Sequence, residues 1–332
     1  MKTLVTGGGG FLGRAIVEEL LDRGDTVSVL SRSRYPDVEA LGATGVAMDL
    51  SKPCPDLIAV LSDVDTVFHV AAKAGIWGDR DSYWSINVGG TKRLLEASIQ
   101  AGVTRFVYTS SPSAVFSGQD EIGLTESDCQ YPERYLTHYP ESKAAAEQIV
   151  LAANGRDLAT TVLRPHLIWG PRDPHLVPRL LARGRAGRLR IVGSGTNRVG
   201  LTYVDNAAHA HVLAADVLCP TSANAGKAYF ITDDDPVVLW EWVNRLFVAL
   251  SVPPVTRRVS AKMALNAGGM LEWIWRVFRL GGEPPMTRFM ARQLATHHYY
   301  DLSAARADFG YSERVGPSVG WDRMIEWFVD KE

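Results

Sequence analysis

The chain has 332 residues, 46% of them hydrophobic, and its 35 basic and 37 acidic side chains leave a net charge of −2. This length and composition can bury a large core, which excludes a disordered chain and indicates one large domain or two closely joined ones. The balanced charge offers no basic field for nucleic acid, and no apolar run reaches the ~18 residues that a bilayer requires.

The cysteines and the first residues bear on the cellular setting. Cys54, Cys129 and Cys219 are too widely spaced for a C-x-x-C motif, so the sequence predicts neither a disulfide framework nor a zinc site. The first predicted strand begins at residue 2, with no basic and apolar leader before it. We therefore expect a cytoplasmic protein without a signal peptide.

The first predicted unit is the stretch 4–13, which reads L-V-T-G-G-G-G-F-L-G and indicates a strand, a tight turn and a helix. Gly7 permits the turn, Gly10 lets the backbone approach a pyrophosphate, and Gly13 lets the helix pack closely on the strand. The free N–H groups of the helix N-terminus then face the anion. The stretch predicts a dinucleotide site rather than a structural turn. The expected cofactor contacts here are Gly7, Gly10, Phe11, Leu12 and Gly13.

A second strand over 26–30 leads into Ser31, Arg32, Ser33 and Arg34, where no acid is present. An NAD site usually has Asp or Glu at this point for the ribose hydroxyls, whereas hydroxyl and guanidinium groups suit a 2′-phosphate. The sequence therefore favours NADP(H) over NAD(H), with Ser31 and Arg32 as contacts. The alternative is a solvated loop arginine, an interpretation that fits Arg34 better than Arg32.

The next elements continue an alternation of strands and helices. Strands are predicted over 45–48, 66–70 and 105–109, with a helix over 87–102 before the last of them. Five strands separated by four helical patterns predict a doubly wound parallel sheet, in which ligands bind at the carboxyl ends of the strands. The cofactor contacts expected at these ends are Asp49, Leu50, Ala71, Ala72, Lys73 and Thr109.

The candidate chemical centre follows the strand 105–109. Ser111 ends a Ser-Ser pair there, and Tyr139 and Lys143 open an alanine-rich helix as Y-P-E-S-K. Residues four apart share a helical face, so the phenol and the ammonium can both point toward the cofactor. A nearby ammonium favours the phenolate, so we expect Lys143 to lower the pKa of Tyr139 and make it a proton relay. Ser111 can hydrogen-bond the same substrate oxygen.

The chain resembles the extended short-chain dehydrogenase/reductase family along nearly its whole length. The motifs that carry the resemblance are T-G-G-G-G-F-L-G at 6–13, Asp49-Leu50, H-V-A-A at 69–72, N-V-G-G-T at 87–91, Y-T-S-S at 108–111, Y-P-E-S-K at 139–143 and R-P-H-L-I-W-G-P at 164–171.

That resemblance implies a role for each matching residue. It makes Tyr139 the acid/base, Lys143 the ribose-binding and tuning residue, and Ser111 the group that orients the carbonyl. It implies that Asn87 holds a helix kink or a water near the lysine. Ser113 stays a rival for the serine role, because the insertion 112–114 blurs the count. The implied lining of the nicotinamide pocket is Pro165, Leu167 and Ile168.

After a sixth strand over 160–164 the composition changes. A run of arginines predicts a solvated face, or one arginine that holds a substrate carboxylate. The stretch 200–215 resembles the family's return to the nucleotide-binding sheet, with Asp205 capping a helix. We expect a Rossmann domain over 1–165 and a mainly substrate-binding region over 166–332, of which about 200–232 returns to the sheet. The arginines are Arg179, Arg183, Arg185, Arg188 and Arg190.

No metal site is predicted. His209 and His211 are two residues apart and so lie on different sides of a helix, and the pair His297-His298 lacks nearby acid or thiol partners. Both pairs are interpreted as structural.

A long amphipathic helix is predicted over 262–280. Its polar positions share one stripe and leave a broad apolar face that must cover something. The helix packs on its own domain, or the face forms a wall for a long substrate, docks a partner enzyme or touches a membrane surface. The polar positions are Lys262, Asn266, Glu272, Arg276 and Arg279; the apolar ones are Met263, Met270, Leu271, Trp273, Ile274, Trp275, Val277 and Phe278.

Within the family, the chain is similar to the 3β-hydroxysteroid dehydrogenase branch and, in it, to the bacterial 2-alkyl-3-oxoalkanoate reductases of long-chain olefin synthesis. The motifs are R-Y-P at 34–36, A-A-K-A-G-I-W-G at 71–78, R-P-H-L-I-W-G-P at 164–171 and L-A-T-H-H-Y-Y-D at 294–301. This similarity implies NADPH-dependent reduction of a β-keto acid with two long alkyl chains, in concert with partner enzymes of the pathway.

Two other functions stay open from the sequence, a 3β-hydroxysteroid or sterol dehydrogenase and a non-catalytic NADP-binding sensor or scaffold. We expect a homodimer with a long-chain acyl-derived substrate. The expected substrate contacts are Ser113, Trp77, His166, Trp169 and Tyr203.

Overall fold

A computed structural model describes residues 1–331 of the chain. Its main element is a seven-stranded sheet in the order β12-β7-β5-β4-β1-β2-β3, in which every neighbouring pair is parallel. The chain starts in the middle at β1, runs outward to β3 and returns to β4 on the other side, so the switch point lies between β1 and β4. The predicted doubly wound parallel sheet is confirmed. The strands are β1 (Lys2–Thr6), β2 (Thr26–Ser31), β3 (Thr44–Ala47), β4 (Thr66–His69), β5 (Arg105–Thr109), β7 (Ala159–Pro165) and β12 (Ala228–Ile231).

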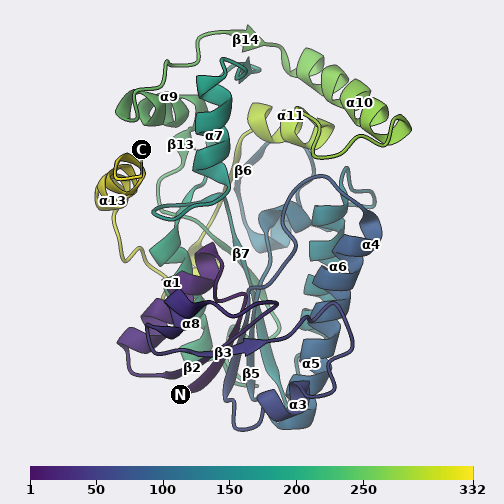
Figure 1. Cartoon of the computed structure of the whole chain (residues 1–332), viewed down its shortest axis with the longest axis vertical. Helices are drawn as coiled ribbons and strands as arrows, with labels where there is room; N and C mark the ends of the chain where they lie inside the picture. Colours follow the sequence, from purple (N-terminus) through teal and green to yellow (C-terminus); the bar gives the residue numbers. More distant parts are fainter. Residues whose placement is uncertain (332) are drawn as a thin grey trace.

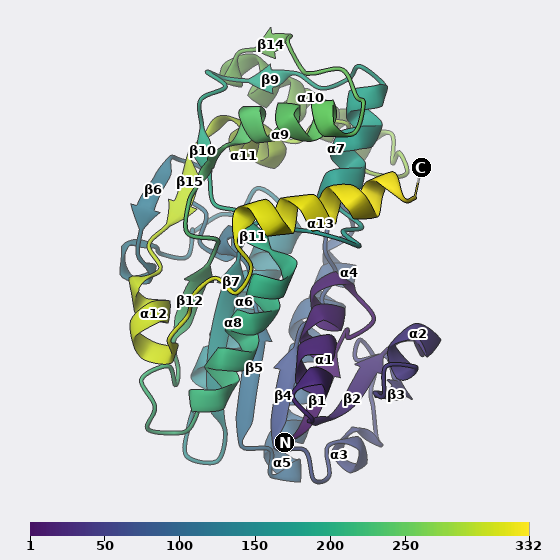
Figure 2. The same cartoon turned by 90° about the vertical axis from the view of Figure 1, so that its left-hand side faces the viewer.

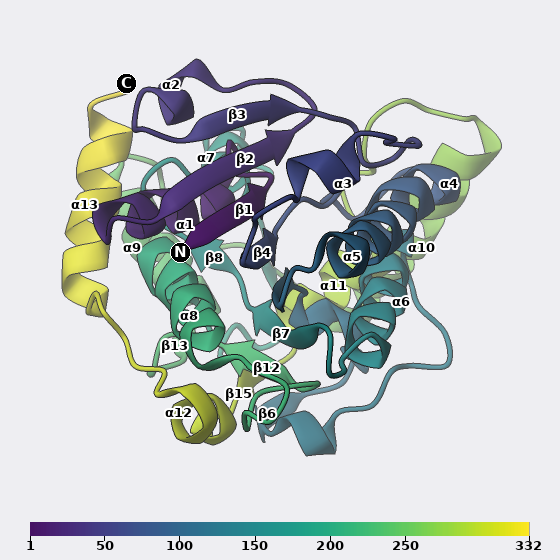
Figure 3. The same ribbon diagram turned by 90° about the horizontal axis from the view of Figure 1, so that it is seen from below.

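Helices cover both faces of this sheet (Figure 3). Helices α1 (Phe11–Asp22) and α8 (Val204–Val217) lie on one face, and α3 (Leu57–Val60), α5 (Gly90–Ala101) and α6 (His138–Ala152) lie on the other. Inner strands such as β4 and β7 are buried on both faces because each is a short apolar or β-branched run, whereas the edge strand β3 is partly exposed. Helix α1 is amphipathic, because Leu12, Ile16 and Leu20 recur every four residues and are buried on one side.

The predicted helix over 87–102 begins earlier and less regularly than expected. Helix α4 (Arg80–Tyr83) starts after Asp79, whose carboxylate accepts a hydrogen bond from the Ser82 N–H, and continues into a π-helical turn over Trp84–Gly89 before α5. Such π-turns insert an extra residue into a helix and are frequent at functional sites. The kink that the family resemblance assigns to Asn87 corresponds to this turn.

The C-terminal region lies beyond the carboxyl ends of the sheet (Figures 1 and 2). Its helices are α7 (Leu176–Arg185), α9 (Leu239–Ala249), α10 (Ala261–Val277) and α11 (Arg288–Ala295), with α12 (Ser303–Phe309) and α13 (Pro317–Val329) returning along one side. A four-stranded sheet in the order β13-β10-β15-β6 flanks them. The remaining short elements are α2 (Pro36–Glu39), β6 (Glu121–Leu124), β8 (Ile168–Trp169), β9 (Ile191–Val192), β10 (Arg198–Val199), β11 (Thr202–Tyr203), β13 (Val237–Val238), β14 (Arg258–Val259) and β15 (His298–Tyr300).

Helix α10 departs in part from the expected orientation of the amphipathic helix, because Glu272 of the polar stripe is buried while the other polar positions are exposed. Its packed side consists of Ala264, Gly268 and Glu272, which lie against α11. A Cβ on Gly268 would come within 2.7 Å of the Thr287 carbonyl carbon, so the glycine allows a close backbone approach. Glu272, predicted on the solvent stripe, is buried and forms an ion pair with Arg288 at 2.8 Å. Of the apolar face that was expected to be covered, Leu271, Ile274 and Trp275 are partly buried, whereas the other five residues are exposed.

One smaller expectation also changes. Helix α8 begins at Val204 with Tyr203 as N-cap, so Asp205 lies in the first turn instead of capping the helix. Its carboxylate still lies near the positive end of the helix dipole and faces Arg323 at 3.5 Å. None of the helices in residues 1–331 combines the length and the apolar character needed to cross a bilayer.

Candidate active site

A cleft of about 780 Å³ opens at the carboxyl ends of β1, β2, β4 and β5. It runs from the glycine turn past the end of β4 to the start of α6, and the segment after β7 closes its far side. Nearly all the residues predicted to bind cofactor or to catalyse line this one cleft. They are Gly7, Gly10, Phe11, Leu12, Gly13, Ser31, Arg32, Asp49, Leu50, Ala71, Ala72, Lys73, Thr109, Ser111, Tyr139, Lys143, Pro165, Leu167 and Ile168.

The glycine turn holds the backbone where a larger side chain would not fit. Gly7 has a φ of +69°, and a Cβ there would lie 3.0 Å from the Ala71 backbone. A Cβ on Gly13 would lie 2.2 Å from the Gly7 carbonyl oxygen. Gly10, which has no side chain, is the N-cap of α1, so the first-turn N–H groups of this helix face the cleft. Such a cradle suits a pyrophosphate.

The end of β2 presents hydroxyl and guanidinium groups and no acid. Arg32 lines the cleft, whereas Arg34 turns away and forms a two-pronged ion pair with Glu39, with Nε and Oε1 2.8 Å apart. The Ser31 hydroxyl is buried and finds no hydrogen-bond partner among residues 1–331. Asp49 accepts hydrogen bonds from the Ser51 N–H and hydroxyl, which lower the pKa of its carboxyl.

Asn87 does not line the cleft but fixes two of its walls. Its Oδ1 accepts from the Lys73 backbone N–H at 2.7 Å, and its Nδ2 donates to the Lys73 carbonyl at 3.1 Å and to the Ser142 hydroxyl at 2.9 Å. The side chain is buried, so these bonds are made out of water. Asn87 therefore ties the chain after β4 to the first turn of α6.

Tyr139 and Lys143 lie one turn apart in α6, and Ser111 faces them from the end of β5. Burial raises the pKa of the Tyr139 phenol, and a hydrogen bond with Ser111 lowers it by less. The expected lowering by Lys143 is therefore not what this structure shows, because burial outweighs the neighbouring groups. Ser113 donates to the Ser111 hydroxyl at 3.0 Å and does not line the cleft. Of the two candidate serines, the geometry thus favours Ser111.

Lys143 is buried beneath the cleft. Its Nζ donates to the Thr109 carbonyl at 2.5 Å and lies 4.3 Å from the centre of the Tyr108 ring. Burial lowers the pKa of Lys143 to about 7, although the Glu147 carboxylate one turn further on opposes that shift. The lysine therefore titrates near neutral pH in this environment.

Behind the lysine, a buried ion pair fixes α6 to β7. The Arg164 Nε lies 3.2 Å from both Glu147 carboxylate oxygens, and the Tyr131 hydroxyl donates to the same carboxylate at 2.7 Å. Glu147 is fully buried and Arg164 nearly so. These partners hold the catalytic helix in one position relative to the sheet. A separate hydrogen bond joins Thr109 of β5 to His211 of α8, with Oγ1 and Nε2 2.8 Å apart.

Three of the expected substrate contacts lie in the core. Trp169 and Tyr203 are buried with their rings packed together, and the Trp169 Nε1 donates to Asp233. Successive residues of a strand point to opposite faces, so Ile168 faces the cleft and Trp169 the core. His166 is buried beside His298, with their ring nitrogens 3.0 Å apart. The assignment of these three residues to the substrate pocket is therefore corrected.

The remaining substrate candidates lie at the rim or outside it. Trp77 lies in the loop after β4, with the Arg276 guanidinium 5.2 Å above its ring. Arg179 forms an ion pair with Glu283 at 3.2 Å, and Arg190 donates to the Gly187 carbonyl. The five arginines of the predicted carboxylate contact are absent from the lining of the cleft.

Sequence reasoning missed several lining residues. Asp173 is the one with a recognisable signal, since its carboxylate accepts from the backbone N–H groups of residues 175–177 at the start of α7. An acid just before a helix is a typical capping pattern and could have marked this position. The others, with no such signal, are Leu30, Tyr35, Met48, Ser51, Val70, Ala74, Ser82, Ile86, Ser110, His175 and Leu176.

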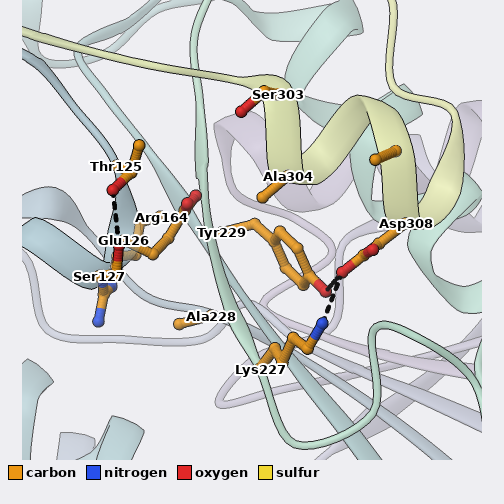
Figure 4. Close-up of a pocket in the computed structure, with 11 residues that line it drawn as sticks. Thr125, Glu126, Ser127, Arg164, Lys227, Ala228, Tyr229, Ser303, Ala304 and Asp308 are labelled. Carbon is orange, nitrogen blue, oxygen red and sulfur yellow. Dashed lines mark hydrogen bonds and ion pairs between the residues drawn. The ribbon is translucent and has the colours of Figure 1, made fainter.

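A second pocket of about 670 Å³ lies at the β12 edge of the sheet (Figure 4). There Asp308 accepts from Lys227 at 2.9 Å and from the Tyr229 hydroxyl at 2.6 Å, so its charged groups are largely paired with one another. It shares no residue with the cleft. Within residues 1–331 no three His, Cys, Asp or Glu side chains are grouped to hold a metal ion.

Known proteins resemble this chain both in sequence and in fold. The model of the 3-beta hydroxysteroid dehydrogenase/isomerase family matches residues 4–259. The 2-alkyl-3-oxoalkanoate reductase of Shewanella oneidensis is 47% identical over 328 residues, covering 96% of this chain and 84% of that protein. The decarboxylating sterol-4-alpha-carboxylate 3-dehydrogenase of Mus musculus is 34% identical, covering 98% and 91%. Among solved structures, MoeE5 in complex with UDP-glucose and NAD has a TM-score of 0.75 and 27% identity, covering 100% of this chain and 99% of MoeE5.

Proposed function

Because the chain belongs to the 3-beta hydroxysteroid dehydrogenase/isomerase family of oxidoreductases, we propose that it is an NADPH-dependent reductase of 2-alkyl-3-oxoalkanoates. The product is the corresponding 2-alkyl-3-hydroxyalkanoate. The observation that carries the proposal is the grouping of Ser111, Tyr139 and Lys143 at one end of a dinucleotide-shaped cleft. The reductase of Shewanella oneidensis, at 47% identity, supports the substrate class.

The residues present fit a nicotinamide dinucleotide. The cradle at Gly7 and Gly13 has no room for a Cβ, and the N-terminus of α1 offers backbone N–H groups to a pyrophosphate. The unpartnered Ser31 hydroxyl and the Arg32 guanidinium suit a 2′-phosphate, and this is what supports NADPH over NADH. When bound, the cofactor supplies a hydride to the ketone carbon.

The protein's own groups handle the oxygen of the ketone. The Tyr139 phenol donates its proton to that oxygen, and Ser111 donates a hydrogen bond that holds the oxygen in place. The raised pKa of Tyr139 keeps the phenol protonated at neutral pH, which suits a proton donor. The Lys143 ammonium stabilises the phenolate that remains. Asn87 acts through its neighbours as a positioning residue, because it holds the Lys73 backbone and Ser142.

A direct assay tests the proposal. Consumption of NADPH is measured with a racemic 2-alkyl-3-oxoalkanoate, and its formation with the more stable 2-alkyl-3-hydroxy acid in the reverse direction. We expect turnover with both and a weaker rate with NADH. Turnover of a 3β-hydroxysteroid with neither acid accepted would move the assignment to a sterol dehydrogenase, a candidate that the 34% identical mouse protein favours.

The cofactor preference has its own test. Arg32→Asp should weaken NADPH binding strongly and NADH binding little, since the two cofactors differ only in the 2′-phosphate. Arg34→Asp is the matched control, because Arg34 is paired with Glu39 and does not line the cleft. Equal NADPH affinity in wild type and Arg32→Asp would remove the 2′-phosphate role from Arg32.

Four broader assignments rest on the sequence alone. We infer that the enzyme acts in long-chain olefin synthesis, as a cytoplasmic homodimer and together with other enzymes of the pathway. A non-catalytic sensor is the least favoured alternative, because the chain keeps both Tyr139 and Lys143 in the cleft. Absence of any turnover together with tight NADPH binding would support the sensor.

A further inference from the structure

Helix α10 carries an exposed apolar surface that the proposed reaction does not use. We define the outer face of α10 as Met263, Met270, Trp273 and Val277, continued past the helix end by Phe278 and Leu280. These six side chains are between 44% and 64% exposed. At 100° per residue the four helical positions fall on one stripe, opposite the side that packs on α11. We propose that this face binds an anionic lipid surface.

Among residues 1–331 no element covers the outer face, since its side chains stay about half exposed or more. The packing of α10 is complete on its other side, where Gly268 lies against Thr287 and Glu272 is paired with Arg288. The outer face does not line the cleft either. Figure 1 shows α10 at the upper right edge of the molecule, on the outer side of α11. An exposed apolar patch of this kind, interrupted here by the exposed amide of Asn266, marks an interaction surface.

The charges around the outer face favour an anionic partner. Lys262, Arg276 and Arg279 are exposed beside it, and the single acid of the helix, Glu272, is buried. The helix therefore shows basic and apolar groups to the outside and no acid. An interfacial helix has this composition, with its apolar side chains in the acyl boundary and its basic ones at anionic headgroups. Trp273 has the amphipathic ring that is enriched at this depth.

A second copy of the chain fits this surface less well. A two-fold contact through the outer face would bring the same patch from both copies together. Lys262 of one copy would then approach Arg276 and Arg279 of the other, with no exposed acid of α10 to pair them. Like charges at short range in an apolar contact are unfavourable. A bilayer also accepts a helix at the edge of the molecule, whereas a protein partner needs a surface of matching shape.

The outer face also lies next to the rim of the cleft. The Arg276 guanidinium lies 5.2 Å above the Trp77 ring, and Trp77 belongs to the loop that begins at Lys73 in the cleft. The chain after α10 reaches the same loop, since a Cβ on Gly75 would lie 3.1 Å from the Glu283 carboxylate. Docking through α10 would place this rim at the lipid surface. The inference does not depend on the proposed substrate.

Co-sedimentation with lipid vesicles tests the inference. The full chain is mixed with vesicles of phosphatidylcholine alone, or of equal parts phosphatidylcholine and phosphatidylglycerol, at low salt. We expect binding to the anionic vesicles and weak binding to the neutral ones. The variant Met270→Ser/Trp273→Ser/Val277→Ser should lose at least ~10-fold in partitioning. The matched control is Val248→Ser, an exposed apolar side chain on α9, which should bind like wild type.

The basic residues give a second, independent readout. Lys262→Gln/Arg276→Gln/Arg279→Gln should lose about fivefold in affinity for anionic vesicles per charge removed, and little for neutral ones. Quenching by brominated lipid should be reduced in Trp273→Phe, if Trp273 is the inserted ring. Unfolding curves check that the variants are folded.

Three results would overturn the inference. The first is wild-type protein that stays in the supernatant with anionic vesicles. The second is a Met270/Trp273/Val277 variant that sediments like wild type. The third is a dimer by light scattering that becomes a monomer in this variant, because a second copy would then cover the face.

Discussion

The floor of the cleft buries polar groups, whereas the outer face of α10 exposes apolar ones, and both are exceptions to the usual pattern of burial. Beneath the cleft, polar groups are buried, among them the ring of His69 between the Thr6 and Thr91 hydroxyls at 2.7 and 2.8 Å, and the Lys143 ammonium on the Thr109 carbonyl. On α10, Trp273 and its apolar neighbours are exposed while Glu272 is inside.

The two regions differ in whether other elements of the fold supply partners for the unusually placed side chains. Each of these buried polar groups has partners from other elements, so removing a partner is costly, even though burial itself disfavours the charge of Lys143. The outer face of α10 stays largely exposed in residues 1–331, so its side chains contribute little to folding. Substitution should therefore be costly beneath the cleft and nearly free on α10, and the following predictions test that contrast in order of expected size.

The largest effect is expected at the catalytic phenol. Tyr139→Phe removes the proton donor but keeps the ring, and the rate of ketone reduction should fall by ~10²–10⁴-fold. NADPH consumption measures the rate, and fluorescence titration should show cofactor binding retained. Tyr135→Phe is the matched control, because the Tyr135 hydroxyl donates to the Ala114 carbonyl and does not line the cleft. Equal losses in both variants would contradict the assigned role.

The next largest effect is expected on the free energy of unfolding. Glu147→Ala leaves the Arg164 guanidinium buried without its carboxylate, which should lower the free energy of unfolding by ~3–5 kcal/mol. Urea unfolding measures the change. Glu96→Ala is the control, because its pair with Lys92 at 3.8 Å is exposed and should contribute under about 1 kcal/mol. If the alanine variant does not fold, Glu147→Gln should fold and still be less stable than wild type. Full stability in Glu147→Gln would argue against this contrast.

The third prediction concerns pH. The pKa of Lys143 is lowered to about 7 by burial, so the free enzyme carries the ammonium below that pH and loses it above. The ammonium stabilises the phenolate, so kcat/KM for reduction should be level below pH 7 and fall by up to about tenfold per pH unit above it. Lys143→Met should be slow at every pH and lack this step. A wild-type profile that is flat between neutral and alkaline pH would contradict the assignment.

The smallest effect is expected on α10. Because the side chains of the outer face touch few others, Met270→Ser/Trp273→Ser/Val277→Ser should change the free energy of unfolding by less than about 1 kcal/mol. Its rate with a short, water-soluble oxo acid should equal that of wild type. A large loss of stability would show that this face packs on something in the folded protein, and the contrast with the cleft would then fail.

The sequence determined the sheet and the reacting groups. The alternation of short apolar runs with helical patterns leads to one architecture, and the glycines at 7, 10 and 13 have one use between a strand and a helix. Tyr139 and Lys143 are four residues apart in a helix, so their common face follows from local geometry. These features depend on neighbours in the chain, which is why a single sequence revealed them.

The tertiary structure decided what each face meets. Asn87 donates a hydrogen bond to Ser142, 55 residues away, and no local sequence pattern predicts that bond. Trp169 belongs to a motif that reaches the cleft, yet the strand turns its ring into the core. Periodicity groups the residues of α10 into two faces but does not say which is covered. That depended on Gly268 and Glu272 meeting α11, because packing is settled by the partner surface and not by one helix alone.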